Sequence, residues 1–335
     1  MNKQDFQAIK ATLKEEGRFR HSKRSGWFWV TLELSVLGTT AYFLAQTEPF
    51  SLWYFIGSFL LALSCFRCFA LMHECGHGSL FANRRINTFF GVVMSGFCVI
   101  PYIAWRNVHR QHHIWTGIVD KDPSAELNID LLNYSDRGRK IVNRLYKAWI
   151  PSPSFALIGL TYWRYPFKQK RLGNKKDAMK GFASLLFVLL VHLVLIIALG
   201  LSEYLLLTAV TFVFYLVIFD NINLAHHAGL YTLSSSRQLK PVPLREQDRH
   251  TRSTPLPAWL SLIACYNFNF HSEHHYYPNL PFVNLPRVRQ ELLKRQVESY
   301  QAVPFLGFLA NLRRNDPIDY YLKTLPSKEE LSGKR

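Results

Sequence analysis

Four long apolar runs constrain how this chain can fold. They cover residues 27–45, 51–72, 181–200 and 204–224 of the 335 residues. Each approaches the roughly 20 residues that an α-helix needs to cross a hydrocarbon layer about 30 Å thick. Glu33, Arg67 and His192 interrupt the first three runs, but no run contains a cluster of charges. The sequence therefore predicts an all-α integral membrane protein with four transmembrane helices.

A fifth apolar stretch, residues 86–104, differs from these runs. Gly91, Gly96 and Pro101 interrupt it, and it also holds the polar side chains Asn87 and Ser95. A broken helix at membrane depth requires neighbouring helices to satisfy its backbone. We expect this stretch to form a re-entrant or interfacial helical segment that returns to the side from which it entered.

The positive charge of the chain is unevenly distributed. The formal net charge is +17, and lysine and arginine collect in residues 1–26, 105–180 and 228–335. The short connectors around Glu48 and Glu203 contain none. Cytoplasmic loops of membrane proteins carry such an excess of basic residues. The pattern indicates a multi-pass protein with both termini cytoplasmic, whose basic segments face a membrane surface rather than a nucleic acid.

The five cysteines do not indicate a disulfide framework. They are Cys65, Cys68, Cys75, Cys98 and Cys265, an odd number that lies mostly in apolar or cytoplasmic segments. The first two form a C-x-x-C, but it lies inside an apolar run and no second pair accompanies it. Redox or structural zinc chemistry is therefore not expected from the cysteines.

Eight of the 13 histidines fall into three short clusters, which we call the first, second and third boxes. The boxes are His73-x₃-His77, His109-x₂-His112-His113 and His271-x₂-His274-His275. Residues at i, i+3 and i+4 share one face of a helix, so each box is expected to aim its imidazoles in one direction. Outside the boxes, His21, His192 and His250 are expected to be ordinary interior or interfacial residues.

Eight clustered imidazoles require a binding partner. They would repel one another when protonated and would leave buried nitrogens unpaired when neutral. Metal ions resolve both problems, because neutral imidazole binds iron, zinc, copper and nickel. Eight or nine nitrogens exceed what one ion accommodates, so two ions are expected. Iron is the metal of this series suited to activating O₂ with nitrogen and oxygen ligands, and no thiolate cluster points to an iron–sulfur site.

Together with their flanks, the boxes resemble those of the membrane fatty acid desaturase and hydroxylase superfamily. The second box lies within Trp105-Arg-Asn-Val-His109-Arg-Gln-His-His113 and precedes Asp120-Lys-Asp122-Pro123. The third lies within Asn267-Phe-Asn-Phe-His271-Ser-Glu-His-His275-Tyr-Tyr-Pro278-Asn-Leu-Pro281. The resemblance covers roughly residues 30–295 of the sequence.

The resemblance implies a non-haem centre of two iron ions, held by the box histidines and by one further histidine after the fourth run. Asn223-x₃-His227 is similar to the pattern at that place in acyl-CoA desaturases, so His227 is preferred to the neighbouring His226. No catalytic residue beyond the metal ligands and no cofactor-binding residue is expected. The expected metal ligands are His73, His77, His109, His112, His113, His227, His271, His274 and His275.

Four acidic residues lie near the boxes. Glu74, Asp120, Asp122 and Glu273 are candidates to orient the imidazoles through hydrogen bonds to their outer nitrogens. For Asp120 and Asp122, the alternative is that they are solvated charges in a cytoplasmic loop.

By the same resemblance, the centre uses O₂ to oxidise an unactivated C–H bond in a lipid acyl chain. A desaturase is the first expectation, and a hydroxylase, ketolase or acetylenase of the same superfamily is the alternative. Whether the acyl carrier is a lipid, coenzyme A or acyl carrier protein stays open. The sequence holds no flavin or nicotinamide fingerprint. Its electrons are therefore expected from a separate donor of the ferredoxin or cytochrome b₅ type.

Two other classes of protein also have histidine clusters. His73-Glu74-Cys75-Gly76-His77 matches H-E-x-x-H, the helix in which zinc metalloproteases bind their metal, including those within membranes. This alternative leaves the second and third boxes unexplained. A metal transporter would place its histidines along a path inside the membrane, whereas these lie at the ends of the runs and in polar segments.

The position of the boxes gives the expected topology. If residues 86–104 crossed completely, the second box would emerge about 30 Å from the first, although metal–nitrogen bonds are only about 2 Å long. We therefore expect four crossings and a cytoplasmic helical cap that carries all three boxes. The expected divisions are a basic cytoplasmic N-terminal segment (1–26), a membrane desaturase-like domain (27–295) and a cytoplasmic C-terminal tail (296–335).

Overall fold

Four long helices in the computed structural model match the four apolar runs. The structure describes residues 1–20, 24–238 and 240–332. Within these residues the chain is helical, without β-strands, and has only two isolated β-bridges. The four helices long and apolar enough to cross a membrane are α2 (Ser25–Ala45), α3 (Leu52–His77), α10 (Lys175–Leu199) and α11 (Leu201–His227). The prediction of an all-α membrane protein with four spans is confirmed.

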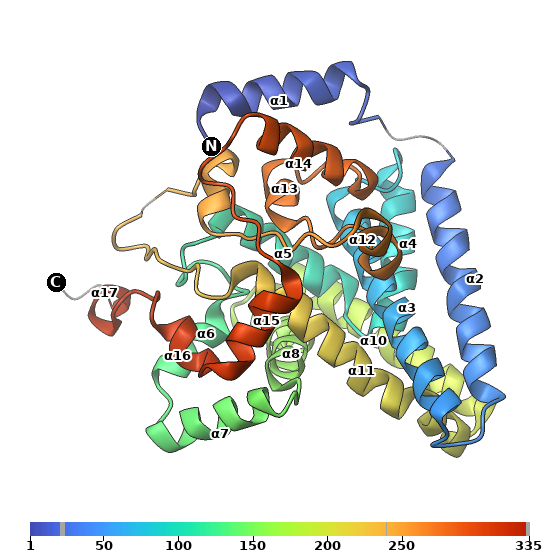
Figure 1. Cartoon of the computed structure of the whole chain (residues 1–335). Coiled ribbons are helices and arrows are strands. Elements are labelled where there is room, and N and C mark those ends of the chain that lie inside the picture. The colour runs from blue at the N-terminus through green and yellow to red at the C-terminus, as the bar shows by residue number, and fades with distance from the viewer. Residues whose placement is uncertain (21–23, 239, 333–335) are drawn as a thin grey trace.

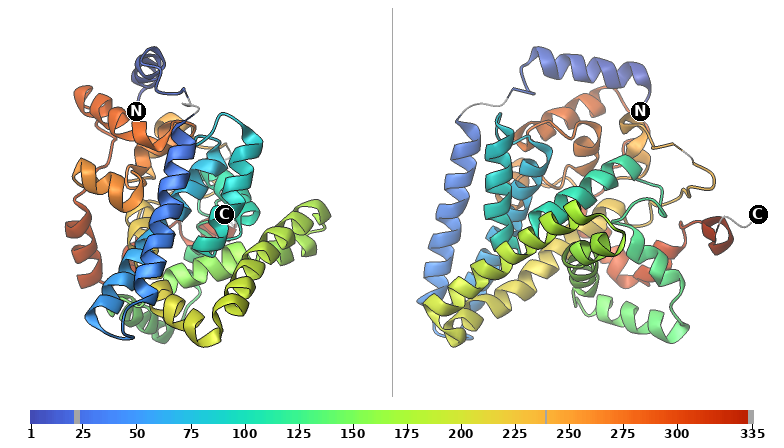
Figure 2. Two further views of the ribbon diagram at one scale, coloured as in Figure 1. Left: turned by 90° about the vertical axis from the view of Figure 1, so that its right-hand side faces the viewer. Right: turned by 180° about the vertical axis from the view of Figure 1, so that it is seen from behind.

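Helix α3 lies at the centre of the membrane part. It packs against α2 on one side and α11 on another, and α10 packs against α11 (Figures 1 and 2). Of the apolar window in α3, 67% is buried within the protein, compared with 17% in α10. Helix α10 therefore exposes most of its apolar surface, as a helix that contacts lipid hydrocarbon does.

The fifth apolar stretch is a broken helix. Helix α4 (Arg84–Cys98) is followed by helix α5 (Tyr102–Trp115), and the chain bends by 103° at the break between them. The break contains Val99 in the left-handed conformation (φ 57°), and Pro101 caps α5. The segment is therefore not one straight crossing, as its Gly and Pro residues predict.

Side chains from neighbouring helices satisfy the backbone around this break. The Trp163 indole donates to the Val99 carbonyl oxygen at 2.9 Å, and the Ile103 amide donates to Ser184 Oγ at 3.1 Å. His192 Nε2 lies 3.1 Å from the Gly96 carbonyl oxygen. These contacts provide the cover that irregular backbone needs at membrane depth. His192 is thus a hydrogen-bonded interior histidine, as expected, whereas His21 lies outside the described residues.

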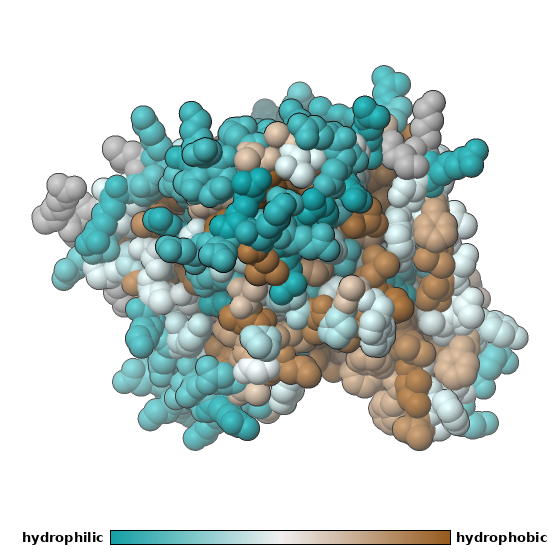
Figure 3. Space-filling view, turned by 45° about the horizontal axis from the view of Figure 1, so that its top comes forward, coloured by the Kyte–Doolittle hydropathy of each residue, from teal (hydrophilic) through white to brown (hydrophobic). Residues whose placement is uncertain are grey.

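The remaining elements form a cap and a side layer. The elements of the cap are α1 (Lys3–Glu15), η2 (Leu244–Arg249), α12 (Ala258–Cys265), α13 (His271–Tyr276), η3 (Phe282–Asn284) and α14 (Leu285–Lys294). Those of the side layer are α6 (Glu126–Leu132), α7 (Asp136–Lys147), α8 (Ser152–Ala156), η1 (Leu157–Trp163), α9 (Tyr165–Arg171), α15 (Phe305–Arg314), α16 (Pro317–Leu322) and α17 (Lys328–Ser332). Figure 1 shows α1 beyond one end of α2, with α14 and α13 below α1. Hydrophilic residues cover much of this end, and hydrophobic ones gather over the spans (Figure 3).

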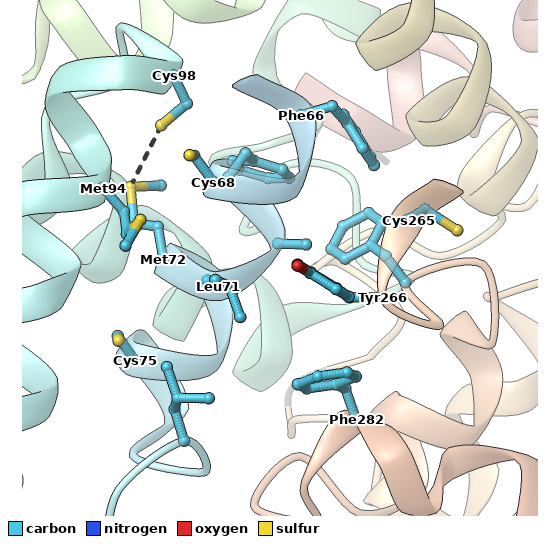
Figure 4. Close-up of a cluster of buried hydrophobic side chains, with 14 of the residues drawn as sticks. Phe66, Cys68, Leu71, Met72, Cys75, Met94, Cys98, Cys265, Tyr266 and Phe282 are labelled. Carbon is cyan, nitrogen blue, oxygen red and sulfur yellow. Dashed lines mark hydrogen bonds between the residues drawn. The ribbon is translucent and has the colours of Figure 1, made fainter. Parts of the chain in front are cut away.

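One hydrophobic core joins the cap to the spans. It runs from Phe66 and Met72 in α3 to Leu285 and Val288 in α14. Figure 4 shows side chains of α3 packed between Met94 and Cys98 on one side and Tyr266 and Phe282 on the other. All five cysteines are free and four are buried, so no disulfide contributes, in agreement with the sequence prediction.

A buried ion pair fixes the start of the cap against the spans. Glu33 in α2 is fully buried and accepts hydrogen bonds from Arg67 Nε in α3 (2.7 Å) and from the Tyr266 hydroxyl (2.6 Å). Arg67 also donates to the Ile263 carbonyl oxygen at 3.1 Å. Tyr266 lies in a left-handed turn five residues before His271, so the network connects two spans to the segment that leads into the third box.

We predict that Glu33→Leu strongly destabilises the protein, because it leaves the Arg67 guanidinium buried without its counter-ion. Breaking a buried pair in this way costs about 3 kcal/mol or more, whereas replacing both partners by apolar groups is much milder. Thermal unfolding of the detergent-purified protein measures the difference. Glu33→Leu should lower the midpoint clearly more than the double variant Glu33→Leu/Arg67→Met. Equal midpoints for the two would contradict this role of the ion pair.

Candidate metal centre

The structure brings all nine predicted histidines into two adjacent groups. Within each group, the candidate ligand nitrogens all lie within 4.8 Å of one another. Group A consists of His73, His77, His109, His113 and His274. Group B consists of His112, His227, His271 and His275.

Helical geometry divides the second and third boxes between the two groups. In α5, His109 and His113 belong to group A and His112 to group B. Residues four apart differ by about 40° around a helix, whereas a residue three apart is turned about 60° the other way. The third box divides in the opposite sense, since His271 and His275 belong to group B and His274 to group A. Each H-x₂-H-H box thus serves both groups, rather than pointing in one direction as the spacing alone suggested.

The nitrogen–nitrogen distances fit a metal ion in each group. In group A, the Nε2 atoms of His77 and His109 lie 2.9 Å apart, and those of His113 and His274 lie 3.0 Å apart. In group B, the Nε2 atoms of His227 and His271 lie 2.7 Å apart. Two nitrogens bound at about 2.1 Å and at right angles around one ion are separated by about 3 Å. His73 Nε2 is buried and has no hydrogen-bond partner among the described residues, so it too is available as a ligand.

Burial favours the neutral form of five of these imidazoles, and neutral imidazole is the form that binds metals. It lowers the pKa of His271, His274 and His275 well below the usual range, and the neighbouring imidazoles lower it further. The pKa values of His109 and His113 are lowered for the same reasons. The arrangement therefore offers unprotonated nitrogens throughout the neutral pH range.

Hydrogen bonds to the ring nitrogen Nδ1 orient three of the four group B imidazoles. Asp122 Oδ2 lies 2.7 Å from His112 Nδ1 and also accepts from the Tyr231 hydroxyl at 3.0 Å. Gln247 Oε1 lies 2.8 Å from His275 Nδ1. The third acceptor is the His250 carbonyl oxygen, which lies 3.0 Å from His227 Nδ1. Each acceptor holds a proton on Nδ1 and leaves Nε2 free to bind a metal.

Of the four acidic candidates, only Asp122 makes a close hydrogen bond to an imidazole. Asp120 binds the Ser235 backbone amide at 2.8 Å, and Glu273 accepts from Ser253 and Tyr300. Glu74 lies 3.4 Å from His73 Nδ1, but its other oxygen accepts from Ser79 Oγ at 2.7 Å. Sequence reasoning missed Gln247 and Tyr231, because each lies far along the chain from the imidazole or carboxylate that it supports.

The two histidines at the end of α11 differ. His227 lies in group B, with Nε2 pointing at that of His271. His226 lies in neither group, and its ring stacks on His271 with the centroids 4.1 Å apart. The placement of Glu74 also does not suit a zinc protease, since this carboxylate is buried and bonded to Ser79 and to the Phe282 amide.

An apolar cavity of about 370 Å³ reaches both groups from one side. His73 and His109 of group A and His112, His227 and His271 of group B line one end of it. Aromatic side chains, among them Phe69, Trp105 and Phe268, also line it, together with residues from α6, α7, α8, η1 and α16. The cavity offers an elongated apolar ligand a site next to the metal-binding nitrogens.

The C-terminal segment forms part of this cavity. Pro317, Ile318 and Tyr321 line it, and Arg313 in α15 anchors the segment through a buried ion pair with Asp220 in α11 at 3.2 Å. The sequence predicts a cytoplasmic tail in residues 296–335 and indicates no part for it in the site. The apolar positions of Phe305-Leu-Gly-Phe-Leu-Ala-Asn-Leu312, which repeat at helical spacing, are the signal that could have identified a packed helix.

These features define an all-α membrane protein with two histidine groups that could hold metal ions, beside an apolar cavity. The profile of the family described as fatty acid desaturase matches residues 49–306. The match covers most of the chain, including the three boxes and both histidine groups. The chain belongs to the fatty acid desaturase family.

Several curated proteins are similar to this chain. An endoplasmic reticulum omega-3 fatty acid desaturase of Vigna radiata is 28% identical over 171 residues, 48% of this chain and 44% of that protein. An sn-1 oleoyl-lipid 12-desaturase of Anabaena variabilis is 23% identical over 284 residues, 80% of this chain and 76% of that protein. A ferredoxin-type sn-1 acyl-lipid omega-3 desaturase of Synechocystis is 33% identical over 90 residues, 26% of this chain and 25% of that protein. The chain spans less than half the length of the first and third of these relatives.

We predict that Gly76→Ala disrupts group A. A Cβ at Gly76 would lie 2.5 Å from Cζ3 of Trp105, and Trp105 stacks on His109 with the ring centroids 4.6 Å apart. The indole must therefore move, and His109 loses its support. We expect about tenfold weaker metal binding, measured as metal retained during dialysis against a chelator.

Gly38→Ala is the matched control, because a Cβ at Gly38 meets nothing within 4 Å. It should retain metal as the wild type does. If Gly76→Ala retained metal equally well, Trp105 would have no role in positioning His109.

Proposed function

We propose that this protein is a membrane desaturase that uses O₂ and two iron ions to introduce a double bond into a lipid acyl chain. The observation that carries the proposal is the meeting of both histidine groups with one end of the apolar cavity. The nine histidines of groups A and B would hold the iron ions, one in each group. A chain of CH₂ groups has no acidity and no leaving group, so acid–base or nucleophilic chemistry cannot begin there. Bound iron supplies the activation of O₂ that such a C–H bond requires.

The residues of the protein position the substrate and the ligands. The cavity wall of Phe69, Trp105 and Phe268 holds the acyl chain against the imidazoles and excludes water, so that geometry selects the carbon that reacts. Asp122 and Gln247 fix the orientation of His112 and His275 through their outer nitrogens. These contacts maintain the site during turnover.

The substrate we propose is an acyl chain of a membrane lipid. Relatives of this chain are named for acyl-lipid and oleoyl-lipid substrates. Forming one double bond from a CH₂–CH₂ unit and O₂ yields two water molecules and consumes two further electrons and two protons. We propose that a separate one-electron donor, of the ferredoxin or cytochrome b₅ type, supplies the electrons, because one relative is named with ferredoxin.

Lipid profiling of a host that expresses the chain tests the proposed reaction. Gas chromatography and mass spectrometry should reveal new unsaturated acyl chains with the wild type. None should appear with His227→Ala, which removes one group B ligand, whereas His192→Gln, a change outside both groups, should produce the same species as the wild type. New hydroxylated or ketone-bearing acyl chains in place of unsaturated ones would contradict desaturation.

We also propose that both termini and the cap face the cytoplasm. The spans are joined at their other ends by connectors without basic residues, and α4 and α5 carry the chain from the first box to the second without a straight crossing. In a background where the native cysteines are replaced, a cysteine at Glu48 should react with an impermeant thiol reagent added to intact cells. A cysteine at Lys121 should react only after permeabilisation. Reaction of the Lys121→Cys variant in intact cells would show that α4 and α5 cross the membrane.

A further inference from the structure

A second cleft reaches group A from outside the acyl cavity. It has a volume of about 680 Å³ and is lined by His77, His109 and His113 but by no histidine of group B. Among the described residues, only Trp105 and His109 line both the cleft and the acyl cavity. Their stacked rings therefore stand between the two, and the cleft is a separate approach to the metal centre.

The cleft is positively charged. Arg84, Arg106 and Arg110 line it, and no aspartate or glutamate does. None of the three forms an ion pair with any described residue. Arg106 rests against Tyr102, with its guanidinium carbon 5.3 Å from the ring centroid. Three cationic side chains that line one cleft without counter-ions attract an anionic partner.

One of these charges is also unfavourably placed for the stability of its helix. Arg84 and Arg85 occupy the first turn of α4, which contains no acidic residue. The N-terminal end of a helix carries a partial positive charge, so cations there are destabilising. Arg84 therefore does not stabilise its own helix, and its charge is available to an anionic partner.

We infer that the Arg84–Arg106–Arg110 cleft is the docking site of an acidic electron-donor protein. This inference rests on the proposed function. Each turnover oxidises two molecules of a one-electron donor, and each molecule gives up one electron and leaves before the next arrives. A small, charge-steered and transient contact suits such exchange. The cleft places this contact beside group A, while the acyl chain occupies the cavity on the other side of Trp105 and His109.

An anionic lipid headgroup is the other ligand that three arginines would attract. The position of the cleft argues against it, because the acyl chain of a lipid held there would have to pass between Trp105 and His109 to reach the cavity. A soluble donor needs no such path. The two ligands are distinguished by the experiment below.

The test measures the affinity of the metal-loaded protein, in nanodiscs of neutral lipid, for a plant-type [2Fe–2S] ferredoxin as the ionic strength is varied. Arg106→Gln/Arg110→Gln should raise the Kd roughly five- to tenfold at low ionic strength and weaken its dependence on salt. Arg106→Lys/Arg110→Lys keeps both charges and should remain close to the wild type. Metal content measured on every sample shows that the variants are folded.

Arg137→Gln/Arg144→Gln is the matched control, because it removes the same charge from α7, away from the cleft. It should leave the Kd unchanged. Equal effects of the two Arg→Gln pairs would overturn the inference, as would loss of binding to soluble dihexanoyl phosphatidylglycerol with ferredoxin binding intact. If ferredoxin binds through these arginines but the wild type forms no alkene, the proposed function fails and the docking site stands.

Discussion

The structure depends on packing nine imidazoles into two groups, within each of which the candidate ligand nitrogens lie within 4.8 Å of one another. Protonated, such a cluster would be driven apart by its own charge, and neutral, it would leave several buried nitrogens without partners. Burial removes the first problem, since it lowers the pKa of the third-box histidines well below the usual range. Metal ions remove the second. The long spans α3 and α11 both end at a histidine of this cluster, so the membrane part and the site form one unit.

Helical geometry divides the box histidines into two groups rather than one. Because i+3 and i+4 diverge around a helix, an H-x₂-H-H box on a helix divides its ligands between neighbouring positions. Helices α5 and α13 do so in opposite senses, so that His112 crosses to group B while His274 crosses to group A. The centre is thereby held by contacts between four helices that lie far apart in the sequence.

The sequence predicted the features that depend on local order. The lengths of the apolar runs predicted the four spans, and Gly and Pro in residues 86–104 predicted a broken helix. Histidine spacing predicted eight candidate ligands, and the family resemblance added His227. It missed the features that arise from tertiary contacts. Gln247 supports His275 from a segment with no motif, and Arg313 anchors the C-terminal wall of the cavity to Asp220, 93 positions away. No spacing rule reports such pairs, because they exist only once the chain is folded.

Two different surfaces adjoin the histidine groups. An apolar cavity meets both groups on one side, and an arginine-lined cleft meets group A alone on the other. The side chains of Trp105 and His109 belong to both walls. This separation would keep the proposed acyl substrate and the proposed donor protein apart, with both close to the same histidine groups.

Iron stoichiometry tests this account most directly. Wild-type protein purified in active form should contain two irons per chain by elemental analysis. The double variant His227→Ala/His271→Ala, which lacks two ligands of group B, should retain one, because group A keeps all five of its imidazoles. A wild-type content of one iron, or active protein that holds zinc and no iron, would contradict the assignment of two iron ions to two groups.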